Sequence, residues 1–526
     1  MKTLYWHKRD FRLIDNDVLH KLEDNSTEFI PFYIWEDFLI NTYQMSGMHK
    51  HVALQVITST REHYKKYDVQ LLEVAGDIIS FLKVMKEIYN FDALYSHMEH
   101  GTTDTYERDR EVNKWCDANN VKRTQLAPSS VVRGLEMRKH REKYWHKYIN
   151  SATNTINKLV TVSNNEYKNI ENNLTPFILA KENLYKNISK SSSENNFDNM
   201  LAPVTEKNAH LTLRDFLKVR SLKYRGSISS PNTALIYGSR LSAHLAWGTI
   251  SLRYIYRETN KIMAELKRSI DLGINTQSDK RQVQSLRGFL SRLHWRDHFI
   301  QRLETNSSMP WRALNPVFEN IEYVQGKEKE KRLTAWLTGT TGEPLVDACM
   351  RCLRQTGFVN FRMRAMCVSY AYYALHIDWR DIGFTLGPMF YDYEPGIHWS
   401  QVQMQAGVVG INALRVYSPE KQMLDQDPEC IFIKKHIPEL SSFTSTDIHN
   451  YKKNKLGDYP APIVDFLASS KIMKKTMYDL KKSTENKIEK EMVLAKHGST
   501  VFKKPFKKKD KGIVKKDDRQ MKLLED

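Results

Sequence analysis

The sequence contains few cysteines and no long apolar run. Five cysteines among 526 residues are too few for a framework of disulfide bonds, which favours a reducing compartment. No stretch of about 18 apolar residues occurs, so we expect no transmembrane helix. The first residues, MKTLYWHKRD, lack the apolar segment of a secretory signal. These absences exclude disulfide-rich secreted and membrane-spanning classes and predict an intracellular, cytoplasmic protein.

The scarce cysteines also limit metal binding. Cys349 and Cys352 have the spacing of a CxxC pair on a predicted helix, with Cys367 and Cys430 in the same half of the chain. Zinc and iron–sulfur sites commonly take four such ligands. A metal site is therefore an open alternative, but we favour ordinary buried thiols and predict no metal.

Length and charge indicate several domains and an anionic partner. A chain of 526 residues exceeds one ordinary core and suits two or three domains. The net charge is +18, and residues 471–526 contain 18 Lys/Arg and 9 Asp/Glu, which contribute half of the excess. The remainder is mildly basic. This balance fits a nucleic-acid partner without requiring one.

The first 130 residues read as an α/β domain. Short apolar runs at 2–6, 29–34, 70–74 and 93–96 predict strands, and the helical pattern at 78–89 is one of several between them. Alternating strands and helices predict a doubly wound parallel sheet.

The rest of the chain divides into three segments. Residues 131–211 form the predicted interdomain connection, and 151–202 within it are rich in Asn, Ser and Lys and are expected to be partly irregular. The helical patterns in residues 212–467 predict an all-α domain. Residues 468–526 predict a basic, flexible tail, in which 502–509 are too basic to fold alone. The tail is either a nonspecific DNA-binding arm or a solvated extension.

Charged residues inside apolar helical patterns mark the candidate site. Arg362 and Arg364 flank Met363, and Asp392 and Glu394 stand beside aromatic residues. Buried charge is costly unless it is paired or holds a ligand. Two alternatives remain open: an internal ion pair between Arg364 and Asp392, or a cavity for a flat, polar cofactor.

Seven blocks of the chain carry a resemblance to a known family. They are WHKRDFRLIDN (6–16), GSRLSAHLAWGTIS (238–251), SRLHWRDHF (291–299), TGEPLVDACMR (341–351), IDWR (377–380), DYE (392–394) and RVYSPEKQ (415–422). Their order resembles that of the DNA photolyase and cryptochrome family. The resemblance implies that an α/β domain is followed by an all-α FAD-binding domain. It also implies a second antenna chromophore, of folate or flavin type, in the first domain; the alternative is a first domain that is only structural.

The resemblance implies roles for fourteen residues. FAD would be contacted by Tyr224, Ser239, Arg240, Leu241, Ser242, Arg296, Asn360, Arg364, Asp392, Glu394 and His398. Photochemistry and lesion contact would involve Trp379, Trp295 and Met404. From physics alone, serines and backbone N–H groups at a helix start suit a pyrophosphate, although a serine there is more often an ordinary N-cap. A helical tryptophan such as Trp295 is likewise more often a core residue.

Several positions depart from the family pattern. Arg292 stands where repair enzymes have Glu, and Phe361 where they have Asn, for which Asn360 would substitute. Val402 and Met404 occupy positions of electron-relay tryptophans. Trp379 is retained, and three further aromatics would offer an alternative relay, namely Trp399, Tyr391 and Tyr393.

The resemblance favours one function over two others. We predict a monomeric enzyme that repairs cyclobutane pyrimidine dimers in DNA by light-driven electron transfer from reduced FAD. The first alternative is a cryptochrome-like photoreceptor that binds FAD without repair. The second is a flavin-binding module that has lost its photochemistry.

Overall fold

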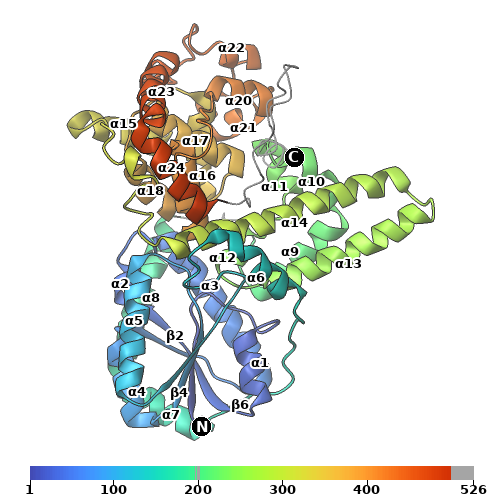
Figure 1. The fold of residues 1–526 in the computed structure, drawn as a ribbon, viewed down its shortest axis with the longest axis vertical. Helices are drawn as coiled ribbons and strands as arrows, with labels where there is room; N and C mark the ends of the chain where they lie inside the picture. Colours follow the sequence, from blue (N-terminus) through green and yellow to red (C-terminus); the bar gives the residue numbers. More distant parts are fainter. Residues whose placement is uncertain (196, 198–201, 499–526) are drawn as a thin grey trace.

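The chain folds into an α/β part and a helical part, joined by a connection that covers both (Figure 1). The computed structural model describes residues 1–195, 197 and 202–498. The fold class predicted from the sequence, a doubly wound α/β domain followed by an all-α domain, is confirmed. Among the described residues, no helix is both long and apolar enough to cross a membrane.

The α/β part is built on a parallel sheet with strand order β3-β2-β1-β4-β5. Its elements are β1 (Thr3–Trp6), α1 (Asp17–Asp24), β2 (Glu28–Glu36), α2 (Asp37–Ile40), α3 (Gly47–Tyr64), β3 (Leu72–Gly76), α4 (Ile78–Tyr89), β4 (Ala93–His97), α5 (Thr103–Ala118) and β5 (Lys122–Leu126). Thr3 of β1 is opposite both Phe29 and Ala93. From β1 the chain adds β2 and β3 on one side and β4 and β5 on the other, so the strand order reverses between β1 and β4. Open α/β sheets form ligand crevices at such a point.

The connection is more regular than expected. It contains α6 (Arg141–Asn150), β6 (Val160–Thr161), α7 (Asn164–Asn173), α8 (Thr175–Asn195) and α9 (Glu206–Lys218). β6 extends the sheet beside β2, and α8 lies against β3 with Leu184 and Ile188 buried. Residues predicted to be partly irregular thus complete the first part's core.

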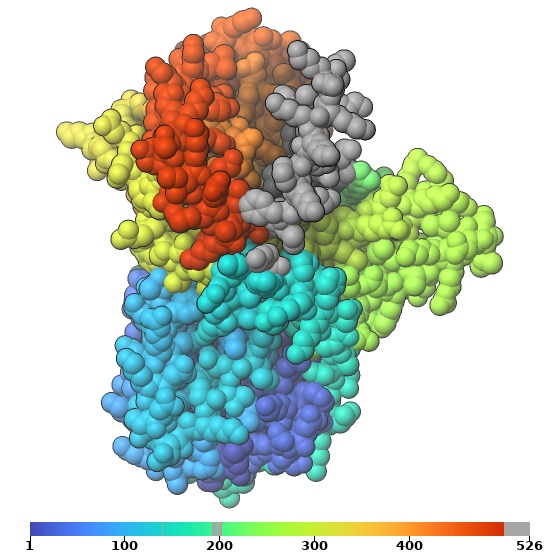
Figure 2. Space-filling view, in the orientation of Figure 1, coloured from blue at the N-terminus to red at the C-terminus, as the bar shows by residue number. Residues whose placement is uncertain are grey.

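The helical part begins after α9. Its elements are α10 (Tyr224–Ser227), α11 (Pro231–Tyr237), α12 (Ser242–Ala246), α13 (Leu252–Asp271), α14 (Thr276–Thr305), α15 (Gly326–Thr338), α16 (Pro344–Thr356), α17 (Phe361–Tyr373), α18 (Trp379–Leu386), α19 (Pro395–Ala406), α20 (Pro419–Gln426), α21 (Ile431–His436), α22 (Ser445–His449), α23 (Phe466–Lys482) and α24 (Thr484–His497). α13 and α14 form a long hairpin that projects from the body (Figures 1 and 2).

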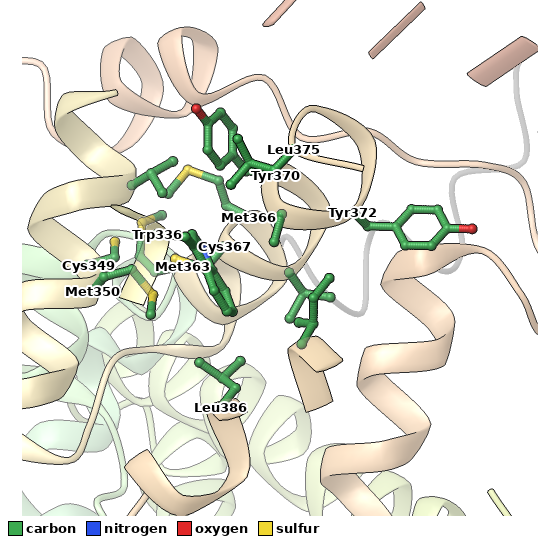
Figure 3. Close-up of a cluster of buried hydrophobic side chains, with 14 of the residues drawn as sticks. Trp336, Cys349, Met350, Met363, Met366, Cys367, Tyr370, Tyr372, Leu375 and Leu386 are labelled. Carbon is green, nitrogen blue, oxygen red and sulfur yellow. The ribbon is translucent and has the colours of Figure 1, made fainter. Parts of the chain in front are cut away.

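α17 is the central helix of this part. It is apolar around most of its circumference, as a fully surrounded helix must be. Figure 3 shows Met363 and Cys367 of this helix beside Trp336 of α15. Cys349 and Cys352 are buried as free thiols, and the described residues contain no group of three or more His, Cys, Asp or Glu side chains placed to hold a metal.

The beginning of the expected flexible tail is folded. Residues 468–482 belong to α23 and residues 484–497 to α24, and Met473, Met477 and Val493 of these helices are buried in the helical core. Their spacing gives each helix an apolar face, which the abundant lysines obscure in the sequence. The basic stretch 502–509 lies outside the described residues.

Candidate functional site

A cavity of about 430 Å³ lies in the helical part. Its volume falls within the range of small-molecule sites. Thirteen of the fourteen predicted site residues line it: Tyr224, Ser239, Arg240, Leu241, Ser242, Trp295, Arg296, Asn360, Arg364, Asp392, Glu394, His398 and Met404. Residues up to 180 positions apart, from Tyr224 to Met404, therefore meet at one cavity, and of the fourteen only Trp379 lies elsewhere.

Arg364 and Asp392 form an ion pair at the cavity wall. Arg364 Nη2 donates to Asp392 Oδ2 at 3.0 Å, and Nε donates to the carbonyl of Val359 at 2.7 Å. The guanidinium group lies over Phe390, 4.0 Å from the ring centroid. The side chain of Asp392 is 3% exposed, whereas that of Arg364 is 24% exposed. One charge is thus buried and its partner is reachable from the cavity.

Several buried polar atoms of the lining have no hydrogen-bond partner among the described residues, including Asn360 Oδ1, Asp392 Oδ1 and Gln401 Nε2. Buried polar atoms are normally paired, and unpaired ones indicate a ligand or ordered water. Two acceptors and one donor in a cavity with aromatic walls fit a planar ring system with polar edges, as in FAD.

His398 lies in the same wall as a neutral imidazole. Burial lowers the pKa of His398 to about 4, and the hydrogen bond from Nε2 to the carbonyl of Gly383, at 2.8 Å, offsets this only in part. The ring is therefore uncharged at neutral pH. Since Nε2 carries the proton for that bond, Nδ1 is left as an acceptor.

A second charged pair separates the cavity from the α/β part. Arg296 Nη2 donates to Glu394 Oε2 at 3.4 Å, and Arg296 Nη1 donates to Asp297 Oδ1 at 2.9 Å. Burial raises the pKa of Glu394, although Arg296 and Arg9 oppose the shift. Arg9, from the loop after β1, also donates to the carbonyl of Tyr393 at 3.0 Å. The bond from Arg9 to Tyr393 therefore links the two parts beside the cavity.

Trp295 and Met404 provide an apolar surface in the cavity. Both are partly exposed, and Trp295 packs edge-on against His298 with 4.6 Å between ring centroids. Its other neighbour, Phe299, lies at 5.7 Å. The tryptophan is thus held from one side by its own helix and also lines the cavity.

The segment expected to bind a pyrophosphate has an unexpected helix start. The N-cap of α12 is Leu241, which makes no side-chain capping bond, and Ser242 is the first residue within the helix. Ser239 and Ser242 line the cavity as ligand-accessible hydroxyls rather than as caps. Arg240 adopts a left-handed backbone with φ of 57° and donates to the carbonyl of Leu235 at 2.5 Å.

Trp379 lies behind the cavity in an aromatic group. It is fully buried and edge-on to Trp399 at 6.3 Å between ring centroids. Trp399 is 4.8 Å from Phe384, which is 6.0 Å from the partly exposed Trp311. His398 connects the group to the cavity, 5.2 Å from Trp399.

The crevice at the strand switch point is occupied by ion pairs. Arg108 bonds Glu36 at 2.6 Å, Glu99 at 2.7 Å and Asp109 at 2.9 Å, while Lys8 bonds Asp109 at 2.6 Å. The space left there is about 100 Å³, which is below the size of ordinary small-molecule sites. These residues do not fit a folate or flavin ring at this crevice.

Sequence reasoning missed part of the lining. Phe289 and Phe299 line the cavity together with Arg292 and Arg296. These positions follow one face of α14 at spacings of three and four, a signal that the sequence contains. Arg415, which opens the block RVYSPEKQ, and Gln405 also line it, and no local pattern distinguishes Gln405.

Known proteins resemble the chain in both parts. The family described as "DNA photolyase" matches residues 3–160, and the one described as "FAD binding domain of DNA photolyase" matches residues 289–479. A deoxyribodipyrimidine photo-lyase of Buchnera aphidicola is 24% identical over 503 residues, which cover 89% of this chain and 95% of that protein. A cryptochrome DASH of Gloeobacter violaceus is 29% identical over 254 residues, 44% of this chain and 46% of that protein. The crystal structure of a class III photolyase from Agrobacterium tumefaciens has a TM-score of 0.74 at 20% identity, covering 92% of this chain and 98% of that one.

Proposed function

The chain belongs to the DNA photolyase and cryptochrome family and contains its FAD-binding domain, and from this premise we propose that it repairs cyclobutane pyrimidine dimers in DNA with light. Relatives named deoxyribodipyrimidine photo-lyase cover 89% and 88% of the chain, and one named cryptochrome DASH covers 85%, so the choice of repair rests on the cavity.

The observation that carries the proposal is the pairing of two surfaces in one cavity. Arg364 and Asp392 provide a charged wall, and Trp295 and Met404 provide an apolar one. A charged wall suits the polar edge of a flavin ring, and an aromatic surface suits a base that has left the duplex. A photoreceptor that does not take in a base would not need the second surface.

The polar residues of the cavity would position the cofactor, and the apolar residues would position the substrate. FAD bound in this cavity would, in its reduced and light-excited form, supply the electron that opens the dimer. Arg364 and Asp392 would hold the polar ring edge, with Nδ1 of His398 as a neutral acceptor beside it. Trp295 and Met404 would stack on the dimer and exclude water from it.

The charge of the chain supports a DNA partner. With a net charge of +18, the protein attracts phosphate backbones irrespective of sequence. Extruding a damaged base pair costs less than extruding an intact one. Binding would therefore combine a nonspecific ionic contribution with selection of the lesion by the cavity.

Repair of a defined substrate tests the proposal. The purified protein, chemically reduced and loaded with FAD, is illuminated with an oligonucleotide that contains one thymine dimer, and restored thymines are counted by chromatography. We expect repair in blue light and none in darkness. Protein that is reduced, flavin-loaded and bound to DNA, yet restores no thymine, would refute repair and leave the photoreceptor.

A matched pair of tryptophan variants tests the placement of the substrate. Trp295→Ala should weaken binding to dimer-containing DNA by about 5- to 150-fold, equivalent to 1–3 kcal/mol for one stacked base, without loss of bound flavin. Trp311→Ala is the control, because Trp311 is 39% exposed and does not line the cavity. Equal weakening by both variants, measured in darkness, would mean that Trp295 does not contact the lesion.

A further inference from the structure

Three arginines are buried together at the junction of the connection, α14 and α24. Arg138 lies in the short helix η2 (Arg138–His140), Arg141 begins α6, and Arg302 lies near the end of α14. They are 3%, 1% and 3% exposed. The last residue of α24, His497, is 2% exposed and lies beside them. None of these residues lines the 430 Å³ cavity, so the group, here termed the arginine cluster, is separate from the FAD site.

The arginine cluster has many N–H donors without acceptors. Arg138 Nη1 donates to the carbonyl of His497 at 2.6 Å, but Nε and Nη2 have no partner among the described residues. Arg302 Nε and Nη1 likewise lack one there, as does Arg141 Nη1. Native proteins rarely leave so many buried donors unpaired without an ion or water at the site.

The nearby carboxylates are already engaged. Asp297 accepts from Ser130 and Arg296, and Glu304 accepts from His100 and Arg133. Glu142 bonds Arg141 at 3.1 Å, but its side chain is 52% exposed. No described carboxylate forms an ion pair with Arg138 or Arg302. Their charges therefore lack a buried counterion from the described residues.

Besides burial, the positive charges of neighbouring arginines lower the pKa of two groups in the arginine cluster, Arg138 and His497. Burial, then the charges of Arg302 and Arg141, holds the pKa of Arg138 well below its usual range. Burial lowers the pKa of Arg302 to about 10. Burial, Arg302 and Arg138 lower the pKa of His497 to about 2, so this imidazole is neutral. A bound anion would relieve the repulsion between the arginines.

We propose that Arg138, Arg141 and Arg302 bind a small tetrahedral oxyanion, with inorganic phosphate as the representative ligand. Guanidinium groups present paired N–H donors that match the oxygen atoms of phosphate. The burial of all three side chains favours a free ion over the backbone of a duplex. The anion joins the connection to α14 and to α24, the last helix of the helical part.

Equilibrium dialysis of the full chain with radiolabelled inorganic phosphate tests the proposal. We expect one phosphate per chain. We also expect a higher Tm in phosphate than in chloride at equal ionic strength, because a ligand that binds only the native state stabilises it. No bound phosphate, together with equal Tm in the two salts, would overturn the assignment.

Two substitutions separate the site from general charge effects. Arg302→Met should weaken phosphate binding at least tenfold and abolish the phosphate-dependent rise in Tm. The same variant should keep its Tm in chloride, since it removes a buried charge that repels its neighbours. Arg302→Lys keeps one charge but loses the planar fork, and should bind with intermediate affinity.

Arg268→Met is the matched control, since Arg268 is an exposed arginine on α13. It should bind phosphate as the unchanged chain does. A loss as large as that of Arg302→Met would place the effect in the overall charge and overturn the proposal. Bound FAD, measured by its absorbance, should be the same in all variants, because the arginine cluster does not line the FAD cavity.

Discussion

The ion pair between Arg364 and Asp392 allows the cofactor site to be tested against a purely structural pair. Removing Arg364 leaves the Asp392 carboxylate, whose side chain is 3% exposed, without its cation. Breaking a buried pair in this way costs about 3–5 kcal/mol. Because the Arg364 side chain is 24% exposed, we expect Arg364→Met to cost about 3 kcal/mol of unfolding free energy in the flavin-free protein.

The double variant distinguishes the two readings. Adding Asp392→Asn removes the uncompensated charge, so Arg364→Met/Asp392→Asn should recover all but about 1 kcal/mol of the stability. FAD affinity should not recover. Loss of a hydrogen bond from a charged group costs about 1.5–3 kcal/mol, so the double variant should bind FAD about 10- to 150-fold more weakly.

Two assays measure these quantities on the unchanged chain, the single variant, the double variant and a control variant. Urea unfolding of the flavin-free chains gives the stability, and flavin fluorescence titration gives the Kd. Lys452→Met is the control, because it breaks a 2.8 Å surface pair with Glu420 and should change stability by less than about 1 kcal/mol. A double variant that binds FAD as tightly as the unchanged chain would refute the reasoning and leave the pair as internal packing.

Three further predictions follow from the structure. Deleting residues 499–526, which contain 10 Lys/Arg and 5 Asp/Glu, should make DNA affinity less sensitive to salt. Each lost phosphate contact lowers the slope of log affinity against log salt concentration by about 0.9. An unchanged slope in filter binding would show that these residues do not contact DNA. Burial raises the pKa of Glu343 to about 7, above its ordinary value of 4.5. The contribution of Glu343 to the free energy of unfolding is therefore fully present below pH 4.5 and is lost as pH rises through 7. Glu343→Gln should therefore gain stability over the unchanged chain between pH 5 and 8, by up to about 3 kcal/mol, and a constant difference in unfolding free energy would contradict this. Purified protein should release FAD and no second chromophore on denaturation, because ion pairs fill the switch-point crevice; one equivalent of folate or of a second flavin would disprove that.

The predictable parts of the fold have strong local periodicity. The helix expected at 78–89 is α4 at the same bounds, because its apolar residues recur at spacings of three and four. The strand β5, with sequence KRTQL, was not predicted, since it is polar and lies at the sheet edge. α7 and α8 were missed because Asn and Ser favour turns locally, whereas packing of α8 against β3 and of α7 against α4 outweighs that preference here.

The site was predictable where motifs keep their order, and not where distant residues meet. The family blocks flank Arg364 and include Asp392, and both residues line one cavity. The arginine cluster joins Arg138, Arg302 and His497, which are separated by more than 150 residues each and share no motif. Only the folded chain shows that these charges lie together.

α14 is one helix of 30 residues, which makes it about 45 Å long at 1.5 Å per residue. Its first turns stand in solvent at the end of the hairpin, and its later turns carry Trp295 and Arg296. The helix contains no proline that would let it hinge. A force applied at the free end of α14 would therefore move Trp295 and Arg296 in the wall of the flavin cavity. The distance between that end and the cavity is greater than any side chain can span.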